Sequence, residues 1–151
     1  MRTLYFRSVP FVKEDVTLAL ESGVDGVLVE EDLHSIARAL WEKGVENVII
    51  TLGGQGSAVV GEDSIDYVPC VRMPHVADPT AAGDSFVGAL AVGLTVGLSR
   101  QAALTFASHT AAITVSRMGA MPSLPTLEEV KSLLKERSCD TVPLASLDVL
   151  H

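Results

Sequence analysis

The sequence has few cysteines, few aromatic residues and no excess of basic ones. It holds two cysteines, Cys70 and Cys139, with no CxxC pattern and no histidine at metal-ligand spacing. We therefore expect two ordinary thiols in a reducing compartment, and neither a disulfide framework nor a zinc site. Lysine and arginine number 11 against 19 aspartates and glutamates, giving a formal net charge of −8. This balance predicts no nucleic-acid partner and no anionic membrane surface, since both bind basic patches.

Long apolar runs are also absent. The most apolar helical stretch, FVGALAVGLTVGL, contains glycines and is too short to cross a bilayer. The N-terminal segment MRTLYFRSVPFVKEDV has neither a long apolar core nor a small-residue cleavage site, so no signal peptide is predicted. The 151 residues are 48% apolar and 20% charged, which is typical of one compact domain. We expect a cytoplasmic protein.

Strand and helix patterns alternate in the first third of the chain. Apolar spacing predicts strands at 2–6, 24–30 and 47–53, and helices at 13–23 and 31–44 that end at glycines. Farther along, it predicts a hairpin within 56–73, helices at 84–97, 99–119 and 126–138, and an irregular tail at 139–151. Ser99 and Thr126 are the expected N-caps, the latter with Glu129 in a capping box. We predict a single α/β domain over residues 1–151, with a mainly parallel sheet flanked by helices.

The stretch DPTAAGDSF places a carboxylate at the start of a predicted helix, directly after three small residues. Ala81, Ala82 and Gly83 leave the backbone bare, and N–H groups at a helix N-terminus form a cradle for an anion. A carboxylate beside such a cradle, here Asp84, can accept the proton of an attacking hydroxyl. Taken alone, Asp84 is better explained as a helix cap, and its three small neighbours are what favour a site. Cradle and base together favour phosphoryl transfer to an alcohol.

A second glycine-rich stretch, TLGGQG at 51–56, follows a buried strand. Its glycines free the backbone to wrap a ligand at the carboxyl end of that strand. No Gly-Lys-Ser/Thr follows, so the stretch is not a Walker A loop. An ordinary strand-to-hairpin turn is the alternative explanation.

Three segments together resemble the ribokinase-like (PfkB) sugar and nucleoside kinases. DPTAAGDSFVGAL resembles the family's C-terminal signature, commonly D-T-x-G-A-G-D-x-F. VENVIITLGGQGSAVV resembles its strand–glycine–strand segment, and ALTFASHTAAITVSRMGAMPSLPTLEEV resembles its adenine-side helix and closing loop. The resemblance covers residues 35–137 and corresponds to the nucleotide-binding, C-terminal half of a ribokinase-like fold.

The resemblance implies roles for the matching residues. Asp84 would be the catalytic base, and the N–H groups of Ala82, Gly83 and Asp84 would form the anion hole. Ala81 stands where the family usually has glycine, a minor change if its φ is negative. The resemblance further implies ATP and magnesium as cofactors and a small sugar or nucleoside as partner. The matching nucleotide-side residues are Thr51, Gly53, Gly56 and Ser108, and those near a monovalent cation such as potassium are Asp78, Thr80 and Ser123.

The chain also departs from the family's pattern. The N-x-x-E motif that helps to organise magnesium has no counterpart in VLVEEDLHSI, where Glu30, Glu31 and Asp32 are the acidic residues. Residues 16–31 are similar instead to the first strand–helix–strand of archaeal-type 3-dehydroquinate synthase, with a junction near 31–35. Three functions stay open: a sugar or nucleoside kinase, a nucleotide-binding module without turnover, and a structural protein that forms homo-oligomers.

Overall fold

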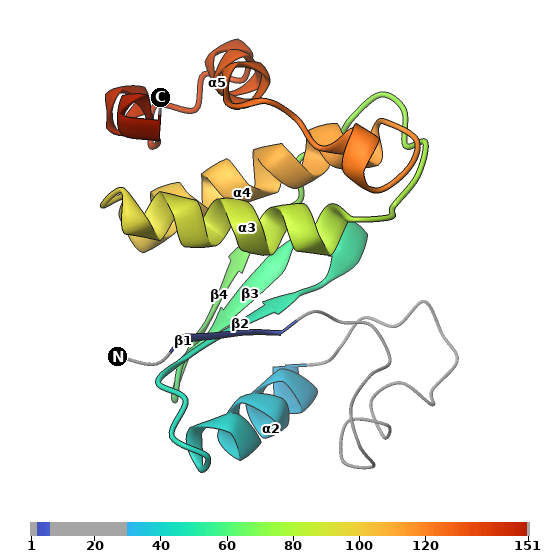
Figure 1. The fold of residues 1–151 in the computed structure, drawn as a ribbon. Helices are drawn as coiled ribbons and strands as arrows, with labels where there is room; N and C mark the ends of the chain where they lie inside the picture. Colours follow the sequence, from blue (N-terminus) through green and yellow to red (C-terminus); the bar gives the residue numbers. More distant parts are fainter. Residues whose placement is uncertain (1–2, 7–29, 151) are drawn as a thin grey trace. The chain divides into compact units, whose positions relative to one another are not determined.

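The computed structural model describes residues 3–6 and 30–150 (Figure 1). The chain divides into two compact units, Met1–Pro69 and Cys70–His151. The predicted helix at 13–23 and nearly all of the predicted strand at 24–30 lie outside the described residues.

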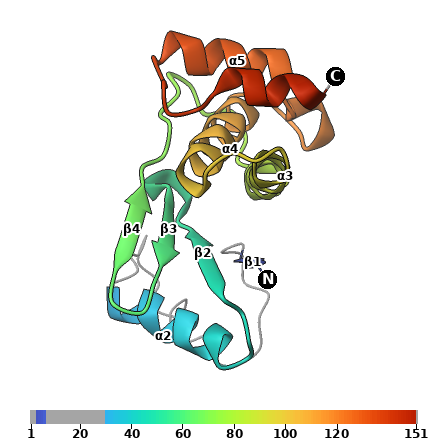
Figure 2. The ribbon, with the colours of Figure 1, turned by 90° about the vertical axis from the view of Figure 1, so that its left-hand side faces the viewer.

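The first unit contains a sheet in the order β1-β2-β3-β4 (Figure 2). Strand β1 (Thr3–Phe6) pairs in parallel with β2 (Asn47–Thr51). Strand β3 (Ser57–Val60) pairs antiparallel with β2 and with β4 (Ile65–Val68). The predicted strand at 2–6 and the predicted hairpin are thus confirmed.

Antiparallel pairing predominates among the described strands, in contrast to the mainly parallel sheet expected. Parallel strands need a long crossover connection, and only the segment between β1 and β2 provides one. A single turn of 3₁₀ helix at Gly53–Gln55 joins β2 to β3, and so short a connection reverses the chain. The strand–helix alternation of the first third of the sequence correctly predicts an α/β fold. After β2, however, the chain forms two antiparallel strands with no α-helix between them.

Helix α2 (Glu30–Trp41) packs on this sheet. Its residues Leu33 and Ala37 are fully buried against alternate residues of β2 and β3, which share one face because strand side chains alternate: Val48, Ile50, Ala58 and Val60. Gly44 follows the helix with φ +86°, and the N–H of Val45 bonds back to the Leu40 carbonyl at 3.1 Å. This left-handed cap is the glycine end that the sequence predicts.

The second unit is built from three helices, α3 (Ala82–Thr95), α4 (Arg100–Val115) and α5 (Leu127–Glu136). Helices α3 and α4 run antiparallel and side by side, and α5 packs on α4 (Figures 1 and 2). Close approach of α3 and α4 requires a small residue, since a Cβ at Gly93 would lie 3.1 Å from the Cβ of Ala103. The C-terminal unit is therefore a tightly packed helical layer.

Both predicted N-caps are confirmed. The Ser99 hydroxyl accepts the Ala102 N–H at 3.2 Å, and Thr126 with Glu129 forms a complete capping box. Helix α4 ends at Val115, before the Gly119 that the sequence suggests, because Ser116 turns back to bond the Ile113 carbonyl at 2.7 Å. No helix among residues 30–150 has the length and hydropathy needed to cross a membrane.

The tail is more ordered than the irregular segment expected at 139–151. It contains the 3₁₀ helix η3 (Leu144–Leu150), whose Leu147 is fully buried. The ammonium of Lys131 on α5 donates to Asp148 at 2.7 Å, which fixes the same segment. Two buried apolar residues, Val142 and Leu147, and one ion pair form no periodic pattern, so the sequence gives little sign of this helix.

Candidate functional site

Helix α3 begins at a residue in an unusual conformation. Ala81 is its N-cap, with φ 62° and ψ 2°, in the left-handed region. The sequence-based prediction that alanine is a minor change here required a negative φ, and that prediction was wrong because the φ of Ala81 is positive. A left-handed alanine costs about 1–2 kcal/mol because its Cβ crowds the following carbonyl. The fold keeps this geometry because the Ala81 carbonyl accepts the Ser85 N–H at 2.9 Å and starts the helix.

Asp78 holds the turn that leads into α3. One carboxylate oxygen accepts the Thr80 N–H at 2.8 Å, and the other accepts the Gly119 N–H at 3.0 Å. Hydrogen bonds from Thr80, through its side chain and its backbone, and from the Gly119 N–H lower the pKa of Asp78 below its usual value. A single carboxylate thus ties the segment before α3 to the loop after α4.

Asp84 lies in the first turn of α3 with its side chain exposed. It follows Ala82 and Gly83, which present no side chain larger than a methyl group. The Ala82 N–H already donates to the Pro79 carbonyl at 3.2 Å. To bind an anion as well, this N–H would have to share its hydrogen between the carbonyl and the anion. A buried bond from Thr114 to Ser85, at 3.0 Å, fixes this end of α3 against α4. The helix N-terminus, with its positive dipole end, is therefore a rigid element beside a carboxylate.

The glycine-rich turn belongs to the first unit. Thr51 pairs with Ser57 across β2 and β3, and the Leu52 N–H bonds to the Gly56 carbonyl at 2.8 Å. Gly53 has φ +56° and Gly56 has φ +102°, so both glycines are required by the backbone of the turn itself. The geometry of the turn alone thus explains why glycine stands at these two positions. A role in ligand binding would be a second function of the same turn.

Two further residues singled out from the sequence are buried. Ser108 lies on α4 with 8% of its surface exposed, and Ser123 is fully buried with its hydroxyl donating to the Ala120 carbonyl at 2.6 Å. Ser108 precedes Thr114 by nearly two helical turns, which places it about 9 Å farther along the helix axis from the α3 contact. In the second unit, Asp78, Thr80 and Gly119 are therefore linked by hydrogen bonds just before the N-terminus of α3. Ser108 lies farther along α4, away from these residues.

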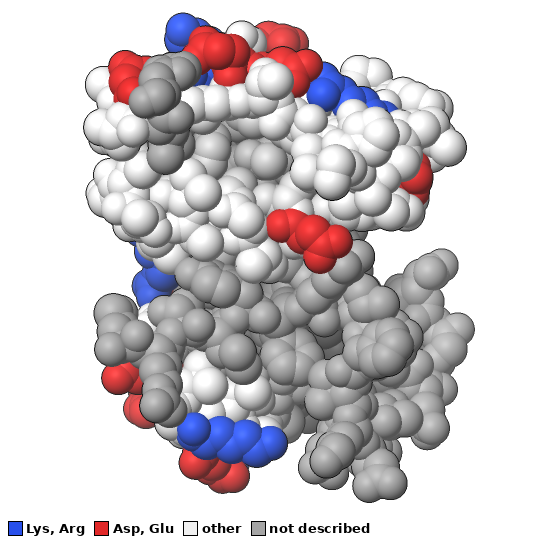
Figure 3. Space-filling view, in the orientation of Figure 1, with Lys and Arg blue, Asp and Glu red and all other residues white. Residues whose placement is uncertain are grey.

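Charged side chains of both signs gather over α5, whereas the surface over α3 is largely uncharged (Figure 3). Arg117, after α4, pairs with Glu129 of α5 through two hydrogen bonds of 2.5 and 3.3 Å. Hydrogen bonding from Arg117, with that from the Thr126 N–H, lowers the pKa of Glu129 to about 2. Arg117 is thereby engaged in a structural pair.

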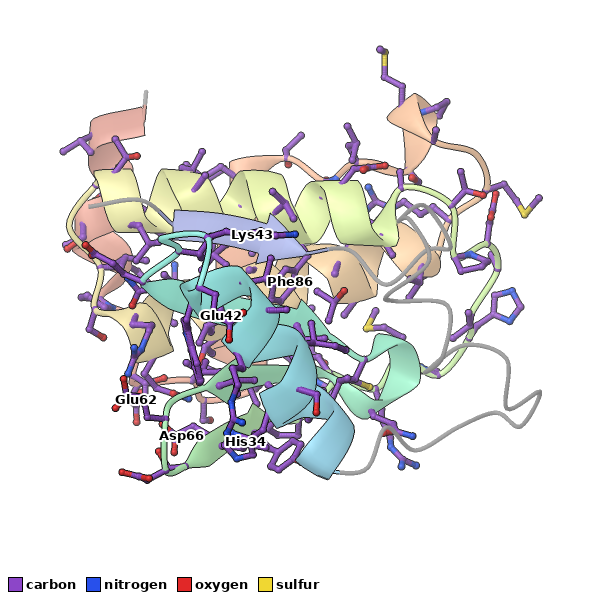
Figure 4. All side chains as sticks on the ribbon, turned by 90° about the horizontal axis from the view of Figure 1, so that it is seen from below. His34, Glu42, Lys43, Glu62, Asp66 and Phe86 are labelled. Atoms are coloured by element: carbon purple, nitrogen blue, oxygen red, sulfur yellow. The ribbon has the colours of Figure 1, made fainter. Side chains whose placement is uncertain are left out.

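No cluster of three or more His, Cys, Asp or Glu side chains suited to a metal ion occurs within residues 30–150. Glu62 and Asp66 project from the β3–β4 hairpin, and Glu42 and Lys43 lie just past α2 (Figure 4).

Sequence reasoning missed two contacts that join distant parts of the chain. The Gly119 N–H on Asp78 links positions that are 41 residues apart, and the thiol of Cys139 lies 3.3 Å from His109, across 30 residues. Asp78 belongs to the DPTAAGDSF stretch, but the sequence does not show that its carboxylate binds the Gly119 N–H or that Cys139 meets His109. His109 itself is 4% exposed and hydrogen-bonded, as expected for a packed histidine at the edge of the core.

Comparison with known proteins points in one direction. The pfkB family carbohydrate kinase profile matches residues 18–127, a span that begins ahead of the resemblance noted from the sequence. The bifunctional ribokinase/ribose-5-phosphate isomerase A of Fructilactobacillus sanfranciscensis is 36% identical over 114 residues, which cover 74% of this chain and 21% of that protein. The likeness of residues 16–31 to dehydroquinate synthase stays a prediction.

Solved structures agree with this match. Arabidopsis thaliana ribokinase, complexed with ribose and ATP, has a TM-score of 0.66 and 32% identity, covering 71% of this chain and 35% of that one. A ribokinase II of E. coli, described as putative and complexed with ATP and Mg²⁺, has a TM-score of 0.62 and 30% identity, covering 70% and 34%. The chain spans 21% and 38% of the length of two curated relatives. Since the profile covers well over half of the chain, the chain belongs to the pfkB family of carbohydrate kinases.

Proposed function

We propose that this chain serves ATP-dependent phosphoryl transfer to a hydroxyl of a sugar. The observation that supports it is the position of Asp84 in the first turn of α3, behind a start of small residues that Asp78 holds in place. The family is one of carbohydrate kinases, and the two solved relatives were complexed with ATP. A nucleoside acceptor is the alternative within the same chemistry.

Asp84 would act as the base in this reaction. The acceptor hydroxyl oxygen attacks the γ-phosphorus, its proton passes to the Asp84 carboxylate, and the bond to ADP breaks. The N–H groups of Gly83 and Asp84, with the dipole of α3, would stabilise the negative charge on the phosphoryl oxygens. Alanine at position 82 leaves room for that group to approach the backbone.

The remaining assignments follow the family's pattern. The nucleotide would contact Thr51, Gly53, Gly56 and Ser108. Its phosphate oxygens, with water, would be most of the ligands of magnesium. When bound, magnesium would neutralise part of the phosphate charge. Potassium would lie near Asp78, Thr80 and Ser123. We propose a cytoplasmic location for this protein. A homo-oligomer stays a prediction.

The direct test measures ADP release from Mg-ATP with a panel of pentoses, hexoses and nucleosides. Asp84→Asn removes the base and nearly preserves shape, so we expect kcat to fall by about 10²–10⁴-fold while nucleotide binding persists. Asp66→Asn, on the exposed edge strand β4, is the matched control and should keep its activity. Binding of Mg-ATP without ADP release for any acceptor would overturn the kinase proposal and identify a binding module.

A further inference from the structure

Cys139 and His109 form a close pair in the second unit. Cys139 follows α5, and His109 lies on α4, the helix on which α5 packs (Figure 1). The Cys139 Sγ is 3.3 Å from Nε2 of His109, within hydrogen-bonding range for sulfur. The backbone fixes the thiol, because Ser138 has φ +53° and the Cys139 N–H bonds to the Leu134 carbonyl at 3.0 Å.

The tautomer of His109 follows from its other contact. Nδ1 lies 2.7 Å from the Thr105 carbonyl, which can only accept a hydrogen bond. Nδ1 therefore carries the proton, and Nε2 of the neutral ring presents its lone pair to the thiol. Burial lowers the pKa of His109, and the nearby positive charge of Arg137 acts in the same direction, against the raising effect of the Thr105 carbonyl. This lowering of the pKa favours the neutral ring, whose Nε2 can accept the Sγ–H at 3.3 Å; Sγ also lies 3.8 Å from the Arg137 carbonyl.

The two cysteines of this chain differ in what surrounds the sulfur. Both are free and partly exposed. Only Cys139 has an imidazole at its sulfur, since Cys70 makes no hydrogen bond through its thiol to the described residues. Reactivity of a thiol depends on losing its proton, and an adjacent base assists that step.

We propose that Cys139 is a modification site for low-molecular-weight disulfides, with His109 as the base that takes its proton. The Cys139 sulfur attacks one sulfur of the disulfide, the reagent's S–S bond breaks, and a mixed disulfide forms on Cys139. The proton moves from Sγ to Nε2 of His109 and then to the departing thiolate, which leaves as a thiol. The cysteine is oxidised and half of the reagent is reduced, so atoms and electrons balance.

The charged residues within two positions of Cys139 in the chain are Arg137 and Asp140, and the charge of Arg137 acts on His109. Arg137 donates to the Arg72 carbonyl at 3.2 Å. Its positive charge disfavours a protonated imidazole at His109. This proposal does not depend on kinase activity.

The test follows the reaction of each thiol in the full chain. The protein is incubated at pH 7 with oxidised glutathione, and the fraction modified at Cys139 and Cys70 is read by peptide mass spectrometry over time. We expect Cys139 to react about tenfold faster than Cys70, since only it has a base in contact. Equal rates at the two positions would overturn the proposal, and this comparison needs no substitution.

A variant then identifies the base. In His109→Gln the amide can accept the Sγ–H bond but cannot take its proton, so we expect the Cys139 rate to fall about tenfold. The Cys70 rate in the same sample is the control for folding and should not change. Loss of Cys139 reactivity with the Cys70 rate intact supports the pair, and an unchanged Cys139 rate contradicts it. If the variant unfolds, Cys70 also changes, and the comparison in the unsubstituted chain decides.

Discussion

At the scale of single residues, the candidate site is defined by conformations as much as by side chains. The DPTAAGDSF stretch allows Asp78 and Asp84 to be singled out from the sequence. It does not reveal that Asp78 uses both oxygens to hold backbone N–H groups, or that Ala81 adopts a left-handed conformation. One of the two Asp78 contacts is with the N–H of Gly119, which lies 41 residues farther along the chain.

Ala81 provides a direct test of this conformation. Ala81→Gly removes the steric conflict of a left-handed alanine, and glycine adopts this φ freely. Part of the gain is offset by the buried methyl group and by the greater freedom of glycine in the unfolded chain. We expect the free energy of unfolding to rise by about 0.5–1 kcal/mol, measured by urea denaturation.

Ala82→Gly is the matched control for that measurement. Residue 82 begins α3, where glycine is a poorer helix former, so stability should fall by about 0.5–1 kcal/mol. Opposite signs for the two neighbouring substitutions would confirm that the conformation at 81 is strained. A loss of stability in both would contradict it.

At the scale of elements, local rules predict helix starts best. Ser99 and Thr126 act as caps because each hydroxyl oxygen accepts a hydrogen bond from an N–H three residues later, a contact that depends only on neighbouring residues. Long-range choices are harder to predict. The pairing of β3 with β2 depends on a turn of three residues, and two buried apolar residues of the tail, Val142 and Leu147, hold it in place. Such contacts have no period in the sequence.

The capping box of α5 predicts a pH dependence. Glu129 has its pKa lowered to about 2 in the folded chain, chiefly by hydrogen bonding from Arg117, against an ordinary value of 4.5. A lowered folded pKa stabilises the fold fully above pH 4.5, and this contribution is lost as the pH falls toward 2. Both side chains are more than one-third exposed, so solvent screening limits the pair to about 1 kcal/mol.

Glu129→Gln tests this pair. Glutamine can preserve the box geometry but has no charge, so we expect stability at pH 7 to fall by about 1 kcal/mol. The difference from the unsubstituted chain should shrink between pH 4.5 and pH 2, followed by urea denaturation at each pH. Glu136→Gln, at the other end of α5, is the control and should shift stability by less than about 0.5 kcal/mol. A difference independent of pH would show that charge is not the cause.

At the scale of the whole molecule, composition and motif together identify the family but not the acceptor. The net charge of −8 is compatible with an anionic nucleotide only where a local positive end, such as a helix N-terminus, opposes it. The chain covers 35% of the solved Arabidopsis ribokinase. The sequence therefore singles out the start of α3 as the candidate site and does not specify which sugar would be the acceptor.

Nucleotide binding can be separated from turnover through the stability of the whole chain. A ligand that binds only the folded state raises its stability by about 2.7 kcal/mol at a free concentration of about 100 times Kd. We expect Mg-ATP to raise the melting temperature of the unsubstituted chain and of Asp84→Asn alike, because the carboxylate is proposed to act on the acceptor hydroxyl. Magnesium chloride at the same concentration is the control and should not produce the shift. A chain that melts at the same temperature with saturating Mg-ATP would not hold the nucleotide at all, whereas a shift in both forms with activity in only one would assign Asp84 to the proton transfer.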